Sequence, residues 1–328
     1  MDDKSHNLNT ARDATVSPEM SGERFDKAAA RLFPEHSRAE ITVWIQAGAV
    51  LLDGMQCKPK VRVKGGEKVS LAASAQVRDY WQEPEDIPLD IVHADNDILV
   101  LNKPAGLVVH PGAGNNTGTL VNALLFHFPE LSGVPRAGVV HRLDKETSGV
   151  MVIAKNLTTH HALVEMIGER QVNREYLGIT EGRMISGRDV DEPIGRDPNV
   201  RTRQAVREDG KPAYTEFRVA ERYRTHTLVR AKLGSGRTHQ IRVHLQSIGY
   251  PLVGDKRYGA RGKVPVAAAP ELRASLQGLQ RVGRQALHAE RLSFVHPITQ
   301  ERLEFAVPLP VDLTEVRNRL LSDNERLI

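Results

Sequence analysis

Apolar residues recur at helical spacing from residue 24 onward. The first such series ends at Pro34 and consists of Phe25, Ala28, Ala29, Leu32 and Phe33. Residues 37–40 (Ser-Arg-Ala-Glu) match a capping box and predict a second helix, which Gly48 would end. Short apolar runs at residues 50–52, 61–63 and 69–71 predict strands. We therefore expect a small unit of two helices and a few strands over residues 23–75.

The segments around this unit are polar. Residues 1–22 show no hydrophobic periodicity, which predicts a disordered tail. Residues 76–88 are acidic and contain proline, as is typical of an interdomain linker. A larger domain is expected over residues 89–313, and residues 314–328 are expected to form a C-terminal tail.

Strand-like and helix-like runs alternate in the larger domain. Strands are predicted by the apolar runs at residues 98–101, 149–154 and 228–233. Helices are predicted at residues 120–126 and 158–167. This pattern favours a mixed α/β or α+β domain built on a large sheet.

Composition narrows the possible classes of protein. The chain has 328 residues, of which 40% are hydrophobic and 26% are charged, so it can build a substantial core. Its single cysteine, Cys57, excludes an intrachain disulfide and favours an intracellular protein. Because the start of the chain does not resemble a signal peptide and no apolar run is long enough to span a membrane, we expect a soluble, cytoplasmic protein.

Basic residues gather in the small N-terminal unit. The net charge is only +4, but the isoelectric point is about 9.2. The unit carries Arg24, Lys27, Arg31, Arg38, Lys58, Lys60, Arg62, Lys64 and Lys68. Such clustering indicates a polyanionic partner such as RNA. The alternative is an ordinary solvated surface, since six acidic residues lie among these nine bases.

A charged loop at residues 141–149 is the strongest candidate for chemistry. Its sequence, His-Arg-Leu-Asp-Lys-Glu-Thr-Ser-Gly, places Asp144 between two cations, and β-branched apolar runs precede and follow it. Both runs, at residues 137–140 and 150–154, are typical of buried strands. A charged loop between core strands is a common way to build an active site, although a solvated surface turn has the same composition.

Two other segments are candidates for the same site. Gly234-Ser235-Gly236-Arg237-Thr238 leads into a predicted helix, with Thr238 as its N-cap and Arg237 near its positive end. Tyr176 lies in a strand-like run, where most tyrosines serve only to pack the core.

Several kinds of site are disfavoured. The glycine-rich segment at residues 102–114 lacks the Gly-Lys-Ser/Thr ending of a nucleotide-binding loop. His239 and His244 are five residues apart and point in different directions on a helix, so no metal site is expected. The sequence has no Gly-x-Ser-x-Gly motif and no obvious carboxylate partner for Asp144. A single aspartate would then act as a nucleophile or a base.

These motifs resemble a known family. His141-Arg142-Leu143-Asp144, Thr147-Ser148-Gly149 and the run from Gly236 to His244 are similar to those of the large-subunit pseudouridine synthases of the RluA group. Residues 103–106, 254–259, 287–289 and 296–299 match further motifs of the group in the expected order. The N-terminal unit resembles the S4-like RNA-binding module. The resemblance covers nearly all of residues 23–313.

The resemblance implies an α+β catalytic domain with a large, mainly antiparallel sheet, and isomerisation of uridine to pseudouridine without a metal or other cofactor. It makes Asp144 the group that attacks C1′ of the ribose or takes a proton from C2′. It makes Arg237 the cation that pairs with Asp144, Tyr176 the surface on which the uracil stacks, and Arg142 the side chain that enters the vacated space in the RNA.

His141, Arg24, Lys27 and Arg38 are expected to contact RNA. The implied partner is large-subunit ribosomal RNA or a precursor of that subunit, met by a monomeric enzyme, and one branch of the group modifies several uridines of the subunit-interface stem-loop, helix 69. Two alternatives stay open: the same reaction on other ribosomal or transfer RNA uridines, and a non-catalytic RNA-binding factor in ribosome assembly.

Overall fold

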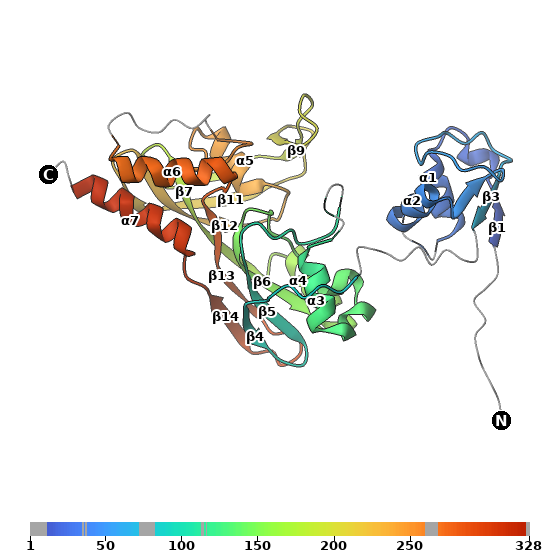
Figure 1. Ribbon diagram of the computed structural model, residues 1–328, viewed down its shortest axis with the longest axis horizontal. Coiled ribbons are helices and arrows are strands. Elements are labelled where there is room, and N and C mark those ends of the chain that lie inside the picture. Colours follow the sequence, from blue (N-terminus) through green and yellow to red (C-terminus); the bar gives the residue numbers. More distant parts are fainter. Residues whose placement is uncertain are drawn as a thin grey trace. The chain divides into compact units, whose positions relative to one another are not determined.

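The computed structural model divides the chain into two compact units, Met1–Tyr80 and Trp81–Ile328 (Figure 1). It describes residues 12–34, 36, 38–71, 83–112, 115, 117–259 and 268–325. Most of the predicted linker at residues 76–88 therefore lies outside the described residues. Among the described residues, none of the helices combines the length and apolar composition needed to cross a bilayer.

The N-terminal unit packs two helices against a small sheet. The helices α1 (Phe25–Leu32) and α2 (Arg38–Ala47) confirm the predicted pair. Strands β2 (Val50–Leu52) and β3 (Lys68–Leu71) are also as predicted, and they pair antiparallel. The third prediction, a strand at residues 61–63, is wrong, because that segment forms only one isolated bridge, between Arg62 and Arg24.

Part of the predicted disordered tail is folded. Strand β1 (Arg12–Thr15) pairs antiparallel with β3, and a 3₁₀ helix η1 (Pro18–Met20) follows it. Val16 and Met20 are buried in the core of this unit. The prediction for residues 1–22 is thus wrong from residue 12 onward. A short edge strand is held mainly by main-chain hydrogen bonds, so its side chains carry little hydrophobic pattern.

The second unit, Trp81–Ile328, is built on a nine-stranded sheet with the order β4-β5-β6-β13-β7-β12-β11-β8, in which β14 also pairs with β13. The strands are β4 (Ile91–Ala94), β5 (Ile98–Lys103), β6 (Ser148–Ala154), β7 (Asn173–Glu181), β8 (Arg188–Asp191), β11 (Tyr214–Arg222), β12 (His226–Leu233), β13 (Leu287–Val295) and β14 (Arg302–Ala306). All pairs are antiparallel except β6 with β13. A separate hairpin joins β9 (Ile194–Arg196) to β10 (Gln204–Val206). The three predicted strands of the larger domain are confirmed as β5, β6 and β12.

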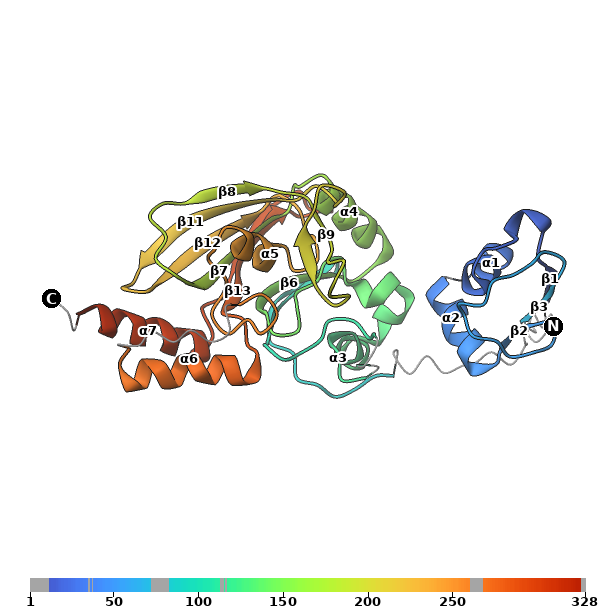
Figure 2. The same ribbon diagram turned by 90° about the horizontal axis from the view of Figure 1, so that it is seen from above.

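Helices lie beside this sheet (Figure 2). The predicted helices are confirmed as α3 (Leu120–His127) and α4 (Leu157–Gly168), with the 3₁₀ segments η3 (Pro129–Gly133) and η4 (Pro135–Gly138) between them. The run at residues 137–140 is not a strand: it contains the end of η4 and a single bridge from Val139 to Ile153.

The predicted C-terminal tail is largely helical. Helix α7 (Val311–Glu325) lies beside α6 (Pro270–Val282), as both views show. Leu313, Val316 and Leu320 are buried in a core shared with α6. The predicted boundary at residue 313 is therefore wrong. Many charged residues separate these three apolar positions, which hides the helical spacing.

A close contact between β6 and β13 sets the position of the charged loop. Gly149 has φ +122°, and a Cβ atom there would lie only 2.2 Å from the carbonyl oxygen of Ala289. Only glycine accepts both the conformation and the contact. The parallel pairing of Ser148 and Gly149 with β13 then brings the end of the loop beside the centre of the sheet.

Candidate active site

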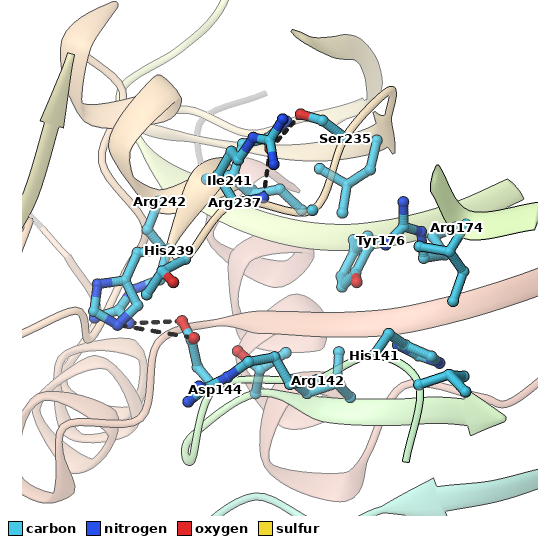
Figure 3. Close-up of a pocket in the computed structure, with 18 of the residues that line it drawn as sticks. His141, Arg142, Asp144, Arg174, Tyr176, Ser235, Arg237, His239, Ile241 and Arg242 are labelled. Carbon is cyan, nitrogen blue, oxygen red and sulfur yellow. Dashed lines mark hydrogen bonds and ion pairs between the residues drawn. The ribbon is translucent and has the colours of Figure 1, made fainter. Parts of the chain in front are cut away.

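A cleft of about 640 Å³ opens where the charged loop before β6, strand β7 and the segment leading into α5 (Gln240–Ser247) meet. Figure 3 shows side chains from all three segments facing this space. Six arginines line the cleft: Arg136, Arg142, Arg170, Arg174, Arg237 and Arg242. Asp144 is the only carboxylate among the lining residues. The cleft is thus suited to a polyanion, with one acidic group at its wall.

Asp144 is held by Arg242, in the first turn of α5. The Nη1 atom of Arg242 donates a hydrogen bond of 2.7 Å to Oδ2 of Asp144. The other side of the same guanidinium binds Asp255, with Nε 2.7 Å from Oδ2 and Nη2 2.9 Å from Oδ1. Burial alone would raise the pKa of Asp255, but the hydrogen bonds and charge of Arg242 outweigh it and lower that pKa. Arg242 therefore bridges two carboxylates, and the bidentate pair with Asp255 fixes where it meets Asp144.

The predicted pairing of Arg237 with Asp144 is wrong in this structure. Arg237 is exposed, its Nε donates to the carbonyl of Pro212 at 3.1 Å, and its amide donates to the side chain of Gln240. The arginine that does the pairing lies five positions further along the same motif. A signal was present in the sequence: Arg242 falls between apolar neighbours on a predicted helix, and a buried arginine needs a carboxylate partner.

Helix α5 begins differently from the prediction. His239, not Thr238, occupies the N-cap position, with a left-handed φ of 59° and no side-chain capping bond. This conformation turns the His239 ring toward Asp144, with Nε2 3.8 Å from Oδ1. Since His239 and Arg242 are three residues apart, both reach the same carboxylate.

Two hydrogen bonds place the His239 ring. The hydroxyl of Tyr258 accepts from the amide of Gln204 at 2.8 Å, and it lies 2.7 Å from Nδ1 of His239. When this hydroxyl donates to Nδ1, the neutral ring carries its hydrogen on Nε2, facing Asp144. Burial lowers the pKa of His239 to about 4, which keeps the ring neutral at physiological pH.

Two buried cations anchor the loop that carries Asp144. Lys103 is fully buried, and its Nζ donates to the carbonyls of Pro104, Leu107 and Lys145 at 2.7, 2.9 and 3.1 Å. Burial lowers its pKa to about 7. Arg284 donates to the carbonyl of Glu146 and to Oγ of Ser148, and its Nε pairs with Asp312 of α7. Sequence reasoning missed both Arg284 and its partner Asp312, because nothing in the local sequence links these two residues, which are 28 positions apart.

Tyr176 and Arg142 both line the cleft. Tyr176 projects from β7 into the cleft and is 5% exposed, and burial raises the pKa of its hydroxyl. Arg142 is exposed at the cleft, two residues before Asp144. Their roles toward RNA stay predictions.

His141 differs from its basic neighbours. Its Nε2 accepts a hydrogen bond of 3.2 Å from the amide of Val152, and burial lowers the pKa of the ring to about 3. The ring is thus neutral at physiological pH. Any contact that it makes with RNA would be uncharged.

Two carboxylates of the N-terminal unit, Asp26 and Glu23, are each shared by two cations. Arg24 and Arg38 both bind Asp26, at 2.9 Å each. Lys27 and Arg31 both bind Glu23, at 3.2 and 2.9 Å. Each group therefore keeps a net positive charge on its exposed side, while Lys58 and Lys60 are exposed with no carboxylate partner among the described residues.

One cluster has the residue types of a metal site, namely Asp95, Asp97 and His296. However, Nδ1 of His296 accepts hydrogen bonds from the amides of Ile298 and Thr299. The hydrogen of a neutral ring must then lie on Nε2, which faces Asp95 at 3.4 Å. Because Nε2 has no free lone pair in this arrangement, the cluster does not fit a metal ion.

Comparison with known proteins agrees with these features. A family model described as RNA pseudouridylate synthase matches residues 97–247, and the S4 domain model matches residues 23–69. The chain is 48% identical over 315 residues to the protein named Ribosomal large subunit pseudouridine synthase D of Xanthomonas campestris pv. campestris, covering 96% of this chain and 94% of that protein. The protein of the same name from Escherichia coli strain K12 is 48% identical over 313 residues, 95% of each chain.

Solved structures give the same picture. Human RNA Pseudouridylate Synthase Domain Containing 4 is similar with a TM-score of 0.56 and 29% sequence identity, over 71% of this chain and 93% of that chain. Human RNA Pseudouridylate Synthase Domain Containing 1 is similar with a TM-score of 0.53 and 28% identity, over 68% and 84% of the two chains.

Proposed function

This chain belongs to the RNA pseudouridylate synthase family, as its motifs predicted, and we propose that it converts uridines of large-subunit (23S) ribosomal RNA to pseudouridine, at several positions of helix 69. It is an α+β RNA pseudouridine synthase with an S4 domain at its N-terminal end. The observation that carries the proposal is the placement of Asp144. Arg242 holds it at the wall of a strongly basic cleft, where it is the only acidic lining residue. The cytoplasm, where ribosomes assemble, is the corresponding location.

The reaction is an isomerisation, so the atoms of the product are those of the substrate. In the covalent route an oxygen of Asp144 attacks C1′ of the ribose, and the C1′–N1 bond breaks with its electron pair going to the uracil. The base rotates, C5 attacks C1′, and the carboxylate leaves. C5 then loses its proton and N1 gains one. In the alternative route Asp144 removes the C2′ proton as the base leaves and returns it after C5 has bonded.

Both routes need the same device from the protein, namely an oriented carboxylate in a space that excludes water. Arg242 and the two loop anchors, Lys103 and Arg284, hold Asp144 before substrate binds. Such prior positioning lowers the barrier, because little reorganisation is left for the reaction itself.

The other cleft residues are assigned to opening the RNA. Turning a uridine out of its stack costs a few kcal/mol. Stacking of the base on an aromatic ring contributes about 1 to 3 kcal/mol in the opposite direction, and Tyr176 offers such a ring inside the cleft. Arg142 is exposed on the loop beside Asp144, where a long cationic side chain can enter the space left by the base. The same loop would thus supply both the nucleophile and the wedge.

The target assignment is tested by mapping pseudouridines in ribosomal RNA from cells that lack this chain. We expect pseudouridine to disappear from helix 69 and to return when the wild-type chain is expressed. Loss at other ribosomal or transfer RNA positions, with helix 69 unchanged, would refute the target while leaving the enzymatic activity in place. An unchanged map would instead favour a non-catalytic role in assembly.

The N-terminal unit is assigned to binding RNA phosphates, and Lys60 offers a clean test. Because Lys60 is exposed and has no carboxylate partner among the described residues, Lys60→Ala should leave the fold unchanged. We expect weaker binding and a salt dependence of log K that is flatter by about 0.7 to 0.9. Arg38→Ala should have a similar effect, since Arg24 still pairs with Asp26 when Arg38 is removed.

Lys68→Ala is the matched control, because Lys68 and Asp13 form a one-to-one pair at 2.8 Å with no excess charge, whereas Arg24 and Arg38 share the single carboxylate of Asp26. The measurement is a titration of the full-length chain with RNA at several salt concentrations. A salt slope that is the same for Lys60→Ala, Arg38→Ala and the wild type would show that these residues form an ordinary solvated surface.

A further inference from the structure

Arg174 is a buried cation in the cleft without an anionic partner. Its side chain projects from β7, the residue is only 6% exposed, and its Nε atom is buried with no hydrogen-bond partner. No carboxylate among the described residues lies within ion-pair distance of Arg174. Leaving an ionised group buried and unpaired costs free energy, so the feature calls for an explanation.

The other buried arginines of the catalytic unit show what a structural arginine requires here. Arg242 binds two carboxylates, and Arg284 binds Asp312, one hydroxyl and several backbone carbonyls. In both, the donors of the guanidinium meet acceptors within the protein. Arg174 stands apart, since no contact within the described protein accounts for its placement.

Its position points to the substrate. Arg174 and Tyr176 are two residues apart on one strand, so both side chains lie on the face that lines the cleft (Figure 3). Across the cleft, Gly236 makes room for the guanidinium: a Cβ atom at that position would lie 2.9 Å from Nη1 of Arg174. Gly236 therefore leaves room for the Arg174 guanidinium beside the surface assigned to the target base.

Asp144 cannot serve as the missing anion. Its carboxylate is bound by Arg242 at 2.7 Å, and it faces His239 on its other oxygen. Of the chemical groups in an RNA substrate, only the phosphodiester is anionic at neutral pH. A planar guanidinium with several free donors matches phosphate oxygens in geometry as well as in charge.

We propose that Arg174 binds a phosphodiester group next to the target uridine and thereby fixes the ribose of the extruded nucleotide against Asp144. The inference rests on RNA as the substrate, but it does not depend on which RNA is modified. In the free enzyme the uncompensated charge destabilises the fold, and the bound phosphate removes that penalty. Arg174 thus contributes to RNA affinity and to the position of the target ribose, although the fold does not need it.

Arg174→Met and Arg284→Met should affect the stability of the enzyme differently. Arg174→Met replaces an unpaired charge by an apolar side chain of similar length, so the melting temperature of the full-length enzyme should stay the same or rise. Arg284→Met is the matched control, because it leaves Asp312 and several carbonyls without their donor and should lower the melting temperature. A fall for Arg174→Met as large as that for Arg284→Met would show that Arg174 serves the fold, and would overturn the proposal.

The phosphate contact is tested with a helix 69 stem-loop that carries one uncharged methylphosphonate linkage, placed in turn on either side of each target uridine. The measurement is single-turnover pseudouridine formation at subsaturating enzyme. For the wild type we expect one linkage per target at which this rate falls by about 10- to 100-fold, the size expected for losing a hydrogen bond to a charged group. For Arg174→Met the all-phosphate RNA should show a loss of that size, and the same methylphosphonate should add little. Arg174→Lys should recover part of the rate.

If Arg174→Met and the methylphosphonate lower the rate independently at every linkage, so that their fold-losses multiply, the contact is refuted. Wild-type enzyme that leaves the unmodified stem-loop unchanged would refute the helix 69 target instead, and the linkage series would then be made in an RNA that the wild type does modify. The two failures are therefore distinguishable.

Discussion

Asp144→Asn is expected to bind RNA as the wild type does and to form no detectable pseudouridine. The amide is isosteric with the carboxylate, but it is a poor nucleophile and a poor base, so neither route to the product remains. Arg242 stays bound to Asp255, which preserves the shape of the cleft. The measurement is single-turnover product formation with saturating enzyme, alongside a binding titration.

Asp209→Asn is a suitable control, because Asp209 is a solvent-exposed carboxylate paired only with Arg207. Its activity should equal that of the wild type. Product formation by Asp144→Asn at a rate within tenfold of the wild type would remove Asp144 from the chemical step.

The catalytic loop and most of the main sheet could be predicted because their signals are local. Residues 98–101 of β5 and 150–154 of β6 are unbroken runs of β-branched and other apolar residues, as is typical of strands buried on both faces. The loop between such a strand and its neighbour is charged over several positions. No knowledge of distant contacts is needed to recognise it as a candidate site.

The choice of arginine could not be made in the same way. Arg237 and Arg242 flank one short segment, and which of them faces Asp144 depends on where α5 begins. That start is set by the left-handed conformation of His239 and its bond to Tyr258, a residue far along the chain. The resemblance assigned the pairing to Arg237, and matching a motif does not show which of its two arginines points toward Asp144; the structure gives that role to Arg242.

The errors at both ends of the chain have a common cause. Strand β1 and helix α7 bury few apolar residues, and what holds them is pairing with segments that are remote in sequence. For α7 this pairing has a functional consequence. Asp312, in its first turn, binds Arg284, which in turn holds the carbonyl of Glu146 in the catalytic loop.

Arg242→Met is expected to abolish most activity and to destabilise the enzyme, whereas Arg237→Met should do neither. Removing Arg242 leaves Asp255, whose side chain is 1% exposed, without its cation, and breaking a buried pair in this way costs about 3 to 5 kcal/mol. It also frees Asp144 from its only arginine partner. We expect the single-turnover rate to fall by about 10²- to 10³-fold, as is typical when one preorganised donor is lost.

A double variant separates the catalytic from the structural effect. Arg242→Met with Asp255→Leu removes the unpaired carboxylate together with the cation, so the melting temperature should recover while the rate stays low. Arg242→Lys keeps the charge but cannot make the bidentate pair and reach Asp144 at once, so it should recover little of the rate. The prediction fails if Arg237→Met slows the single-turnover step as much as Arg242→Met does. In that case Asp144 would change its arginine partner when RNA binds, and Arg237 would replace Arg242 as the group that holds it.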